Sequence, residues 1–329
     1  MLSINRMLAL IADKYPADGV AALTALGLEV ESRPDLSADE IPGALADTKA
    51  AILVVRSTKV NADAFDQGQG LALVIRAGAG VNTIDLEAAT AHGVHVANCP
   101  GKNAVAVAEL TMGLMLALDR NLVDAASQMR AGRWNKKRFV QARGLHGQHL
   151  ALIGFGAIAR EVCTRAQAFG MIVSAHDPYL SEAAAAAAGI RSVGSVAELV
   201  VGADVVSVHV PYTPATHHLV NAEILGAMND GAFLLHAARG GVVDDVALAE
   251  AVRSGRLRAG LDVFEDEPSS KDTPFDHPLT KLDGVYATPH IGASTDQAQT
   301  AVGQEVARIV DGYINGGVVA NAVNTVAPK

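Results

Sequence analysis

The chain contains 329 residues, of which 50% are hydrophobic and 19% are charged, so it is long enough to build two domains with buried cores. Its 35 acidic residues outnumber its 26 basic residues, its net charge is -9, and only 4% of its residues are aromatic. These values argue against a nucleic-acid-binding protein, which needs a basic face and often stacking aromatic residues. Two cysteines, Cys99 and Cys163, are too few for a disulfide framework or a structural zinc site, so we expect a cytoplasmic protein.

The first hundred residues alternate short apolar runs with helical patterns. This alternation is typical of βαβ units and predicts a parallel sheet. The apolar runs are all shorter than the roughly 18 residues that a transmembrane helix needs, so no contact with a membrane is expected. Strands are predicted at residues 7–12, 51–56 and 71–76, and helices at residues 19–26, 38–46 and 62–66.

A second series of elements follows a Pro-Gly break at residues 100–101. Residues 104–128 have helical character with apolar side chains on more than one face, so this segment must be buried on several sides. Alanine-rich residues 183–188 favour a helix, and the last forty residues contain one helix at 295–314. Between these segments the βαβ alternation restarts, with strands predicted at 150–153, 171–175, 205–210, 232–235 and 260–263.

A glycine-rich turn joins a predicted strand to a predicted helix, with the spacing G-x-G-x-x-A. Gly154 permits the tight turn, Gly156 lets a pyrophosphate approach the backbone, and Ala159 lets the helix pack close to the strand. Free N–H groups and the helix dipole favour an anionic diphosphate at this helix N-terminus. The motif therefore predicts a dinucleotide site that includes Gly154, Gly156, Ala157 and Ile158.

The strand after this motif ends in Asp177, 23 residues beyond Gly154. A carboxylate here accepts hydrogen bonds from the adenosine ribose hydroxyls and repels a 2′-phosphate. No arginine follows before Arg191, so the sequence predicts NAD in preference to NADP. The alternative is that Asp177 is only a turn residue before Pro178.

Three later segments carry reactive side chains next to turn residues. They contain Arg239 and His290, and the segment between these two offers more than one carboxylate, with Glu265 and Glu267 as the candidates. Because ligands of open α/β sheets bind at the carboxyl ends of strands, we expect these loops to meet beside the cofactor. An arginine can bind a carboxylate through two hydrogen bonds, and a histidine can accept a hydroxyl proton. A carboxylate can orient that histidine. The set suits hydride transfer at a small anionic 2-hydroxy or 2-oxo acid.

The sequence resembles the NAD-dependent D-isomer-specific 2-hydroxyacid dehydrogenases from about residue 51 to residue 324. Within this family it looks most like the branch that oxidises 3-phospho-D-glycerate, in a short form without a regulatory domain. The resemblance is carried by the three catalytic segments and by the motifs Val55-Arg-Ser-Thr-Lys-Val60, Arg76-Ala-Gly-Ala-Gly-Val81, Gly132-Arg-Trp-Asn-Lys-Lys137 and Asn321-Ala-Val-Asn324.

The resemblance implies a role for each catalytic residue. Arg239 corresponds to the substrate-binding arginine, His290 to the acid–base histidine, and Glu267, which directly precedes Pro268, to the partner of that histidine. The chain departs from the family at His236, where asparagine is common. Further cofactor contacts are implied at Val210, Ala237, Ala238, Asp262, Gly292 and Ala293.

The resemblance also implies an α/β fold with two doubly wound parallel sheets. A Rossmann NAD-binding domain at residues 103–290 is expected to be inserted into a flavodoxin-like substrate domain at residues 1–102 and 291–329. This insertion explains a tail that is too short to fold alone. A homodimer or a dimer of dimers is expected through residues 104–134, with Trp134 and Lys136 reaching the partner's site.

Two cations, Arg56 and Lys59, flank the end of a predicted strand, and Gly78-Ala79-Gly80 offers consecutive N–H groups to a carboxylate. This combination suggests a doubly anionic substrate, and the resemblance implies that residues 56, 57 and 59 hold the phosphate of phosphoglycerate. The alternative is that both cations are solvated surface residues. The predicted substrate-binding set is Arg56, Ser57, Lys59, Gly78, Ala79, Gly80, Arg239 and His290.

The resemblance thus predicts NAD-dependent oxidation of 3-phospho-D-glycerate to 3-phosphohydroxypyruvate, the entry step to serine, with His290 as acid and base. A glyoxylate or hydroxypyruvate reductase, and an NAD-regulated interaction protein like the C-terminal-binding corepressors, remain open. No metal site is predicted. Neither His146-x-x-His149 nor His217-His218 has cysteine or carboxylate partners at ligand spacing, and adjacent histidines on a strand point to opposite faces.

Overall fold

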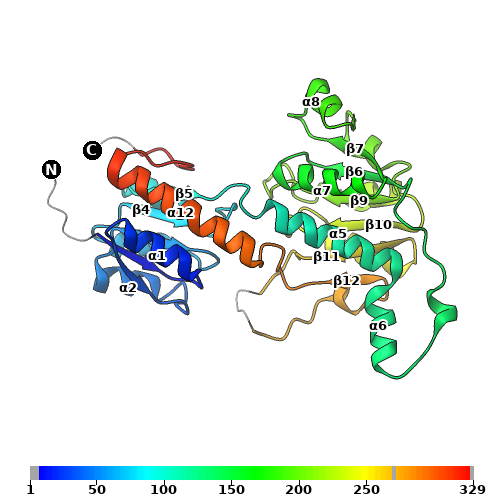
Figure 1. Ribbon diagram of the computed structural model, residues 1–329, viewed down its shortest axis with the longest axis horizontal. Coiled ribbons are helices and arrows are strands. Elements are labelled where there is room, and N and C mark those ends of the chain that lie inside the picture. Colours follow the sequence, from blue (N-terminus) through cyan, green and yellow to red (C-terminus); the bar gives the residue numbers. More distant parts are fainter. Residues whose placement is uncertain (1–6, 269–271, 327–329) are drawn as a thin grey trace. The chain divides into compact units, whose positions relative to one another are not determined.

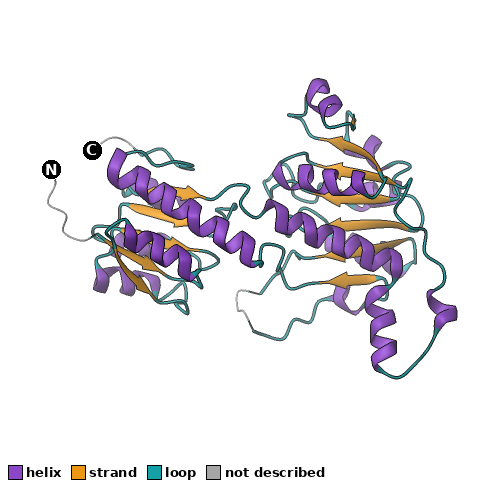
Figure 2. Ribbon diagram, viewed as in Figure 1, coloured by secondary structure: helices purple, strands orange, loops and turns teal. Residues whose placement is uncertain are grey.

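The computed structural model describes residues 7–268 and 272–326. Contacts divide the chain into two compact units, which are Met1–Asn103 with Ser294–Lys329 and Ala104–Ala293. Each unit is a parallel sheet between two layers of helices (Figures 1 and 2). The predicted fold class of two doubly wound parallel sheets is confirmed.

The first unit has a five-stranded sheet in the order β2-β1-β3-β4-β5, which is the flavodoxin-like order. The three central strands agree with the predicted ones, and each is a buried apolar run, as a sheet covered on both faces requires. Two outer strands were not predicted because they contain polar residues and are partly exposed. The strands are β1 Leu8–Ile11, β2 Glu29–Ser32, β3 Ile52–Val55, β4 Leu73–Arg76 and β5 His95–Asn98.

Helices α1 and α12 cover one face of this sheet, and α2, α3 and α4 cover the other. The last segment of the chain returns to the outer strand β5. Asn324 accepts a hydrogen bond from the backbone N–H of Val96 at 2.8 Å, and Ala322 forms a bridge with Ala97. The helices are α1 Ala17–Ala25, α2 Ile41–Thr48, α3 Ala62–Gln67, α4 Leu86–Ala91 and α12 Asp296–Gly316.

The second unit has a seven-stranded parallel sheet in the order β12-β11-β10-β9-β6-β7-β8. The order reverses between β6 and β9, and open α/β sheets bind their ligands in the crevice at such a point. The short edge strands β8 and β12 were not predicted. The strands are β6 His149–Ile153, β7 Ile172–His176, β8 Arg191–Ser192, β9 Val205–Val208, β10 Ala232–His236, β11 Leu257–Leu261 and β12 Val285–Ala287.

Helices α5 and α7 cover one face of the second sheet, and α9, α10 and α11 cover the other. Among the described residues, no helix combines the length and the hydropathy that a membrane span needs. The helices of this unit are α5 Ala104–Arg120, α6 Leu122–Arg130, α7 Ala157–Ala168, α8 Glu182–Ala187, α9 Val196–Val200, α10 Ala222–Ala227 and α11 Asp245–Arg253, with 3-10 helices at Lys136–Phe139 and Pro278–Lys281.

The continuous helix predicted at residues 104–128 is wrong. Asn121 adopts a left-handed backbone with φ of 51°, which ends α5 and starts α6 in a new direction. Asparagine tolerates this conformation better than most residues, so the break falls where its cost is low. The prediction of burial on several sides holds for α5, whereas α6 has no buried residue.

Candidate active site

The functional side chains of the second unit follow its strands at one edge of the sheet. Gly154 follows β6, Arg239 follows β10, Glu267 follows β11, and His290 follows β12. All the strands are parallel, so their carboxyl ends lie along the same edge. Gly154, Arg239 and Glu267 thus follow strands that were predicted, whereas His290 follows β12, which was not.

Gly154 lies at the reversal of strand order, where only glycine fits. Its φ is +90°, and a Cβ atom there would lie 2.8 Å from the carbonyl oxygen of His209 and from the side chain of Val210. Gly156 is the N-cap of α7, and a Cβ on it would meet no described atom within 4 Å. The backbone beside Gly156 thus has open space for a ligand, next to a helix N-terminus that favours anions.

Asp177 holds the glycine-rich turn in place. Its Oδ2 accepts a hydrogen bond from the backbone N–H of Phe155 at 2.8 Å, and its Oδ1 accepts one from Tyr179 at 2.8 Å. The carboxylate therefore serves as a turn residue and also lies beside the dinucleotide motif. The open space, the helix N-terminus and this carboxylate fit an NAD molecule, while the individual contacts, including those of Ala157 and Ile158, stay predictions.

His290 and Glu267 form a hydrogen-bonded pair. Nδ1 of His290 lies 2.7 Å from Oε2 of Glu267, and Oε1 accepts a hydrogen bond from the backbone N–H of Phe264. Burial opposes the charge on Glu267, but the bond and charge of His290, with the Phe264 N–H, outweigh it and lower the pKa of Glu267. Glu267 is therefore an ionised acceptor that orients the imidazole of His290 through Nδ1. The other ring nitrogen, Nε2, remains for proton transfer.

Arg239 is partly buried in the loop after β10. Burial lowers the pKa of its guanidinium, and the charge of Glu267 acts in the opposite direction. The backbone carbonyl of Arg239 lies 2.9 Å from Nε2 of His236, whose pKa burial lowers to about 4. A neutral His236 donating to this carbonyl fixes the turn that presents Arg239. The sequence marked His236 as a departure from the asparagine that is common in the family, but it did not reveal that His236 positions Arg239.

Asp262 supports the loop that carries His290. The buried carboxylate accepts hydrogen bonds from the hydroxyl of Thr288 at 2.6 Å and from the backbone N–H groups of Ile291 and Gly292 at 2.8 Å. These bonds hold His290 in a left-handed conformation with φ of 51°. The hydrogen bonds of Asp262 are thus with this loop. The predicted cofactor contacts of Asp262, Val210, Ala237, Ala238, Gly292 and Ala293 stay predictions.

In the first unit, the backbone around the predicted phosphate residues already binds a carboxylate. Oδ2 of Asp13, a buried side chain after β1, accepts hydrogen bonds from the N–H groups of Arg56, Ser57 and Thr58 at 2.7–3.1 Å. Burial opposes ionisation of Asp13, but these bonds outweigh it and lower its pKa. Only side chains such as Arg56 and Lys59 thus remain for a phosphate. The sequence feature that could have identified Asp13 is its position, because it is the polar residue directly after the first apolar run.

The glycine nest predicted at residues 78–80 is partly used by the protein itself. The N–H of Gly78 donates to the carbonyl of Arg76 at 2.8 Å, so it is not aimed at a ligand as predicted. The guanidinium of Arg76 lies against Gly78, where any Cβ atom would overlap it. A cation that was not predicted therefore lies beside Gly78.

His217 and His218 do not point to opposite faces of a strand, as the sequence predicted. These residues lie in a turn and not on a strand, and His218 has a left-handed φ of 48°. Their rings stack with centroids 3.9 Å apart. Glu265, far away in sequence, supplies the carboxylate that local spacing did not reveal.

Comparisons with known proteins agree with this geometry. Residues 112–292 match the family described as D-isomer specific 2-hydroxyacid dehydrogenase, NAD binding domain. A D-3-phosphoglycerate dehydrogenase of Methanocaldococcus jannaschii is 42% identical over 317 residues, which make up 96% of this chain and 59% of that protein. The chain thus spans about three fifths of the length of this relative.

Two other relatives match along most of their length. A hydroxypyruvate reductase of Thermotoga maritima is 43% identical over 281 residues, or 85% of this chain and 89% of that protein. The crystal structure of the TT0316 protein from Thermus thermophilus has a TM-score of 0.86 at 35% identity, covering 96% of this chain and 100% of that one. The chain therefore belongs to the D-isomer specific 2-hydroxyacid dehydrogenase family and carries its NAD-binding domain.

Proposed function

We propose that this protein is an NAD-dependent dehydrogenase that oxidises 3-phospho-D-glycerate to 3-phosphohydroxypyruvate, the entry step to serine. The main support for a dehydrogenase activity is the pair of His290 and Glu267, whose Nδ1 and Oε2 atoms lie 2.7 Å apart. This pair lies at the same edge of the sheet as Arg239 and the glycine-rich turn. The choice of phosphoglycerate rests on the relatives, which include the D-3-phosphoglycerate dehydrogenase of Methanocaldococcus jannaschii.

In the proposed reaction, Arg239 binds the carboxylate of the substrate and polarises the oxygen on C2. Nε2 of His290 accepts the hydroxyl proton as the C2–O bond gains double-bond character, and Glu267 stabilises the resulting imidazolium through Nδ1. Bound NAD⁺ supplies the acceptor for the hydride that leaves C2. Gly154, Gly156 and Asp177 are the residues proposed to hold this cofactor.

For the phosphate, we propose the side chains of Arg56 and Lys59, whereas the predicted contact of Ser57 would need its hydroxyl to give up the 3.0 Å hydrogen bond to Oδ1 of Asp13. The guanidinium of Arg56 lies 3.2 Å from the hydroxyl of Ser294, and Lys59 is exposed. Ala79 and Gly80 are proposed for the substrate carboxylate, without the N–H of Gly78, which donates to the carbonyl of Arg76. Since Asp13 occupies the backbone N–H groups of residues 56–58, the two cations must provide the affinity for the phosphate.

The test of the substrate is NADH oxidation with phosphohydroxypyruvate, hydroxypyruvate and glyoxylate. We expect a kcat/KM at least about 100-fold higher for the phosphorylated acid, which corresponds to roughly 2.7 kcal/mol of transition-state discrimination. Arg56→Gln should remove most of this preference. Lys49→Gln is the matched control, because Lys49 precedes β3 at the opposite end of the strand. Loss of the preference in both variants would contradict a phosphate role for Arg56.

A second candidate is a hydroxypyruvate or glyoxylate reductase. It is favoured by the Thermotoga maritima hydroxypyruvate reductase, which is 43% identical and matches this chain over 89% of its own length. In that case the three acids would have comparable kcat/KM values, and Arg56→Gln would leave all of them unchanged. A protein without turnover of any 2-oxo acid would instead support the NAD-regulated interaction protein.

A further inference from the structure

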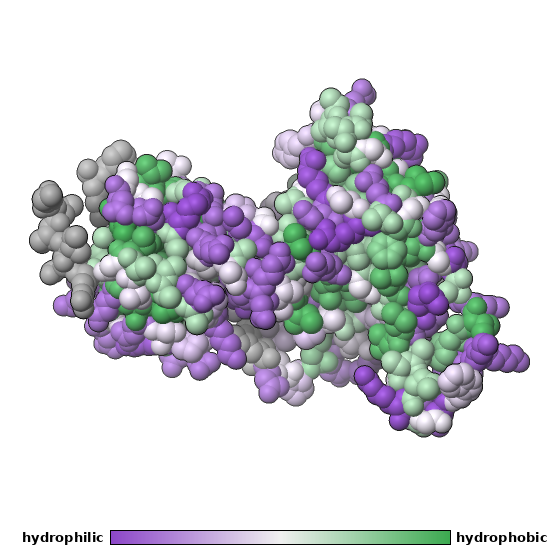
Figure 3. All heavy atoms as spheres, viewed as in Figure 1, coloured by the Kyte–Doolittle hydropathy of each residue, from purple (hydrophilic) through white to green (hydrophobic). Residues whose placement is uncertain are grey.

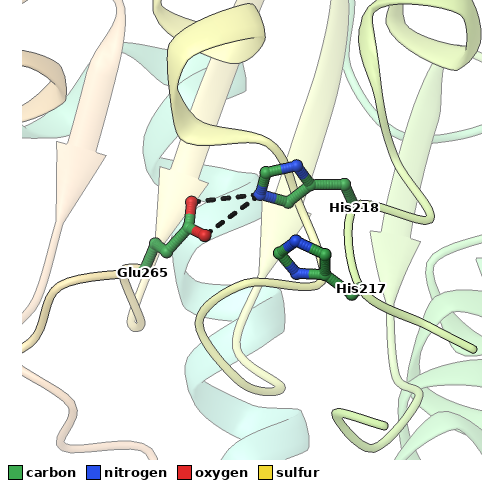
Figure 4. A group of neighbouring side chains, drawn as sticks. All are labelled: His217, His218 and Glu265. Carbon is green, nitrogen blue, oxygen red and sulfur yellow. Dashed lines mark hydrogen bonds and ion pairs between the residues drawn. The ribbon is translucent and has the colours of Figure 1, made fainter. Parts of the chain in front are cut away.

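Two histidines and a glutamate form a cluster outside the proposed reaction (Figure 4). His217 and His218 come from the turn that follows β9, and Glu265 comes from the loop that follows β11. One ligand atom from each side chain lies within 4.8 Å of the other two. All three residues are partly or well exposed to solvent, so an ion can reach them.

Contacts between neighbouring side chains hold this cluster together. Nε2 of His218 lies 3.1 Å from both carboxylate oxygens of Glu265. The ring of His217 stacks on that of His218, with an angle of 27° between the planes. Each of the two rings therefore offers an imidazole nitrogen to the same small volume as the carboxylate of Glu265.

A second carboxylate lies on the other side of His218. Oδ2 of Asp244 is 3.9 Å from Nδ1 of this ring, and Oδ1 of Asp244 is fixed because it caps α11 through the N–H groups of Val246 and Ala247. Histidines that bind metal ions commonly direct their other ring nitrogen at a carboxylate, which orients the ring and raises its basicity. His218 has this arrangement, with Nε2 toward Glu265 and Nδ1 toward Asp244.

The backbone stabilises this placement of neighbouring side chains. A left-handed conformation is uncommon for a residue other than glycine, and it persists only where surrounding contacts hold it. The N–H of His218 donates to the carbonyl of Gly241 at 2.8 Å. This conformation lets two adjacent histidines stack on the same side of the chain.

We propose that His217, His218 and Glu265 bind a divalent transition-metal ion, with Zn²⁺ as the best match, and leave a fourth position for water. Imidazole ligands suit Zn²⁺, whereas Mg²⁺ and Ca²⁺ prefer oxygen ligands alone. Zinc–ligand bonds of about 2.0–2.2 Å place neighbouring ligand atoms roughly 3.3 Å apart. The exposed side chains reach that spacing by small rotations, and the ion replaces the hydrogen shared by His218 and Glu265.

The bound ion would join two loops of the second unit. One is the turn after β9, and the other is the loop after β11, in which Glu265 lies two residues before Glu267. Binding at this site therefore stabilises the loop that carries the partner of His290. This inference needs only the cluster, so it does not depend on the proposed substrate.

The test is calorimetric titration of metal-free protein with Zn²⁺. We expect one ion per chain, a rise in the melting temperature, loss of binding in His217→Ala and His218→Ala, and at least about tenfold weaker binding in Glu265→Gln. His92→Ala is the matched control, because Nε2 of His92 also contacts a carboxylate, that of Asp66, at 2.9 Å. Its affinity for Zn²⁺ should equal that of the wild type.

Co²⁺ provides a second measurement, because its visible absorption reports the geometry of its ligands. We expect a tetrahedral Co²⁺ spectrum from the wild type and from His92→Ala, and none from His218→Ala. Circular dichroism and NADH binding show whether each variant is folded. Absence of zinc binding in folded wild-type protein, or unchanged binding in both histidine variants, would overturn the proposal.

Discussion

His290 is held in a costly backbone conformation by two carboxylates with different tasks. Asp262 binds the hydroxyl and N–H groups around it, and Glu267 binds its ring. A non-glycine residue with φ of 51° persists only where such contacts outweigh the strain. A strained backbone, together with a carboxylate that accepts a hydrogen bond from the ring, is typical of a functional histidine. Both features support the proposed proton transfer.

The first prediction concerns this proton transfer. His290→Gln removes the acid–base group and leaves a side chain that still reaches Glu267, so kcat should fall about 10²–10⁴-fold. The measurement is steady-state NADH oxidation at neutral pH with the best 2-oxo acid substrate. The melting temperature should change little. An unchanged kcat would exclude His290 from the mechanism.

His92→Gln is the control for this experiment. His92 is exposed, and its ring is also paired with a carboxylate, that of Asp66 at 2.9 Å, but it lies in the first unit at the end of α4. The same substitution there should leave kcat unchanged. A similar loss in both variants would point to a general effect of removing a paired histidine.

The sequence identified the site residues whose chemistry is recognisable from their residue type and their place after an apolar run. Arg239, Glu267 and His290 follow apolar runs and carry distinctive functional groups. Asp13 and His236 were missed as positioning residues because their roles depend on backbone groups that folding brings to them. Asp13, for example, binds an N–H group 43 residues away. A backbone N–H group so far away in the chain cannot be identified from the residues next to Asp13.

The turn between β6 and α7 contains two glycines with different physical requirements. Gly154 needs a positive φ and has no room for a Cβ atom, whereas Gly156 has a φ of -76° and open space beside it. The structure of the turn therefore requires the first glycine. The second is required only if a ligand approaches the backbone closely.

The second prediction follows from this difference. Gly156→Ala should keep the wild-type melting temperature and weaken NADH binding about tenfold or more, since the new methyl group occupies the space for the diphosphate. Gly154→Ala should lower both stability and affinity. Fluorescence titration with NADH and thermal denaturation measure these effects. Tight NADH binding by Gly156→Ala would argue against the diphosphate at this turn.

Helix α12 is anchored to the first unit by a buried carboxylate. Glu305 is 2.6 Å from Arg308, 2.8 Å from Asn321 and 3.2 Å from Lys102. Hydrogen bonds from these groups outweigh burial and lower the pKa of Glu305 to about 2. One side chain therefore connects α12, the returning tail and the segment that leaves the first unit.

The third prediction is the pH dependence of this contribution. The folded-state pKa lies below the ordinary value of 4.5, so the unfolded chain binds the proton first and the stabilisation exists above about pH 4.5. Urea denaturation should show that Glu305→Gln loses up to roughly 3 kcal/mol at neutral pH. This difference should shrink between pH 4.5 and 2. Glu29→Gln, at an exposed position on β2, is the control and should show no such window.

Elements were predictable where packing and local pattern agree. Buried central strands such as β3 and β4 are continuous apolar runs, and they appear where expected. The edge strands β2 and β12 are short and partly exposed, so their sequences resemble loops. The break at Asn121 was missed because apolar residues continue on both sides of it, while the backbone angle of one residue changes the direction of the chain.

The second unit has an apolar surface on α6 and the segment that follows it. Leu122 and Met129, which lie seven residues apart on α6, are 51% and 54% exposed, and Trp134 is 80% exposed. In Figure 3, hydrophobic and hydrophilic side chains lie next to each other over α6. Apolar patches that extend over several neighbouring residues commonly mark interfaces. We therefore propose that this surface, which lies within the predicted range 104–134, forms the interface of a homodimer.

The last prediction tests this interface. Lysine at both Leu122 and Met129 would place charges in the proposed contact, and charged residues are depleted from the centres of interfaces. Sedimentation velocity should show dimers for the wild type and monomers for this double variant. Val201→Lys is the control, because Val201 is also exposed but lies after α9. Dimers that survive in the double variant, or a wild-type monomer, would contradict an interface on α6. Monomers with normal kcat would show that each chain holds a complete site, whereas a loss of kcat would support the predicted contribution of Trp134 and Lys136 to the partner's site.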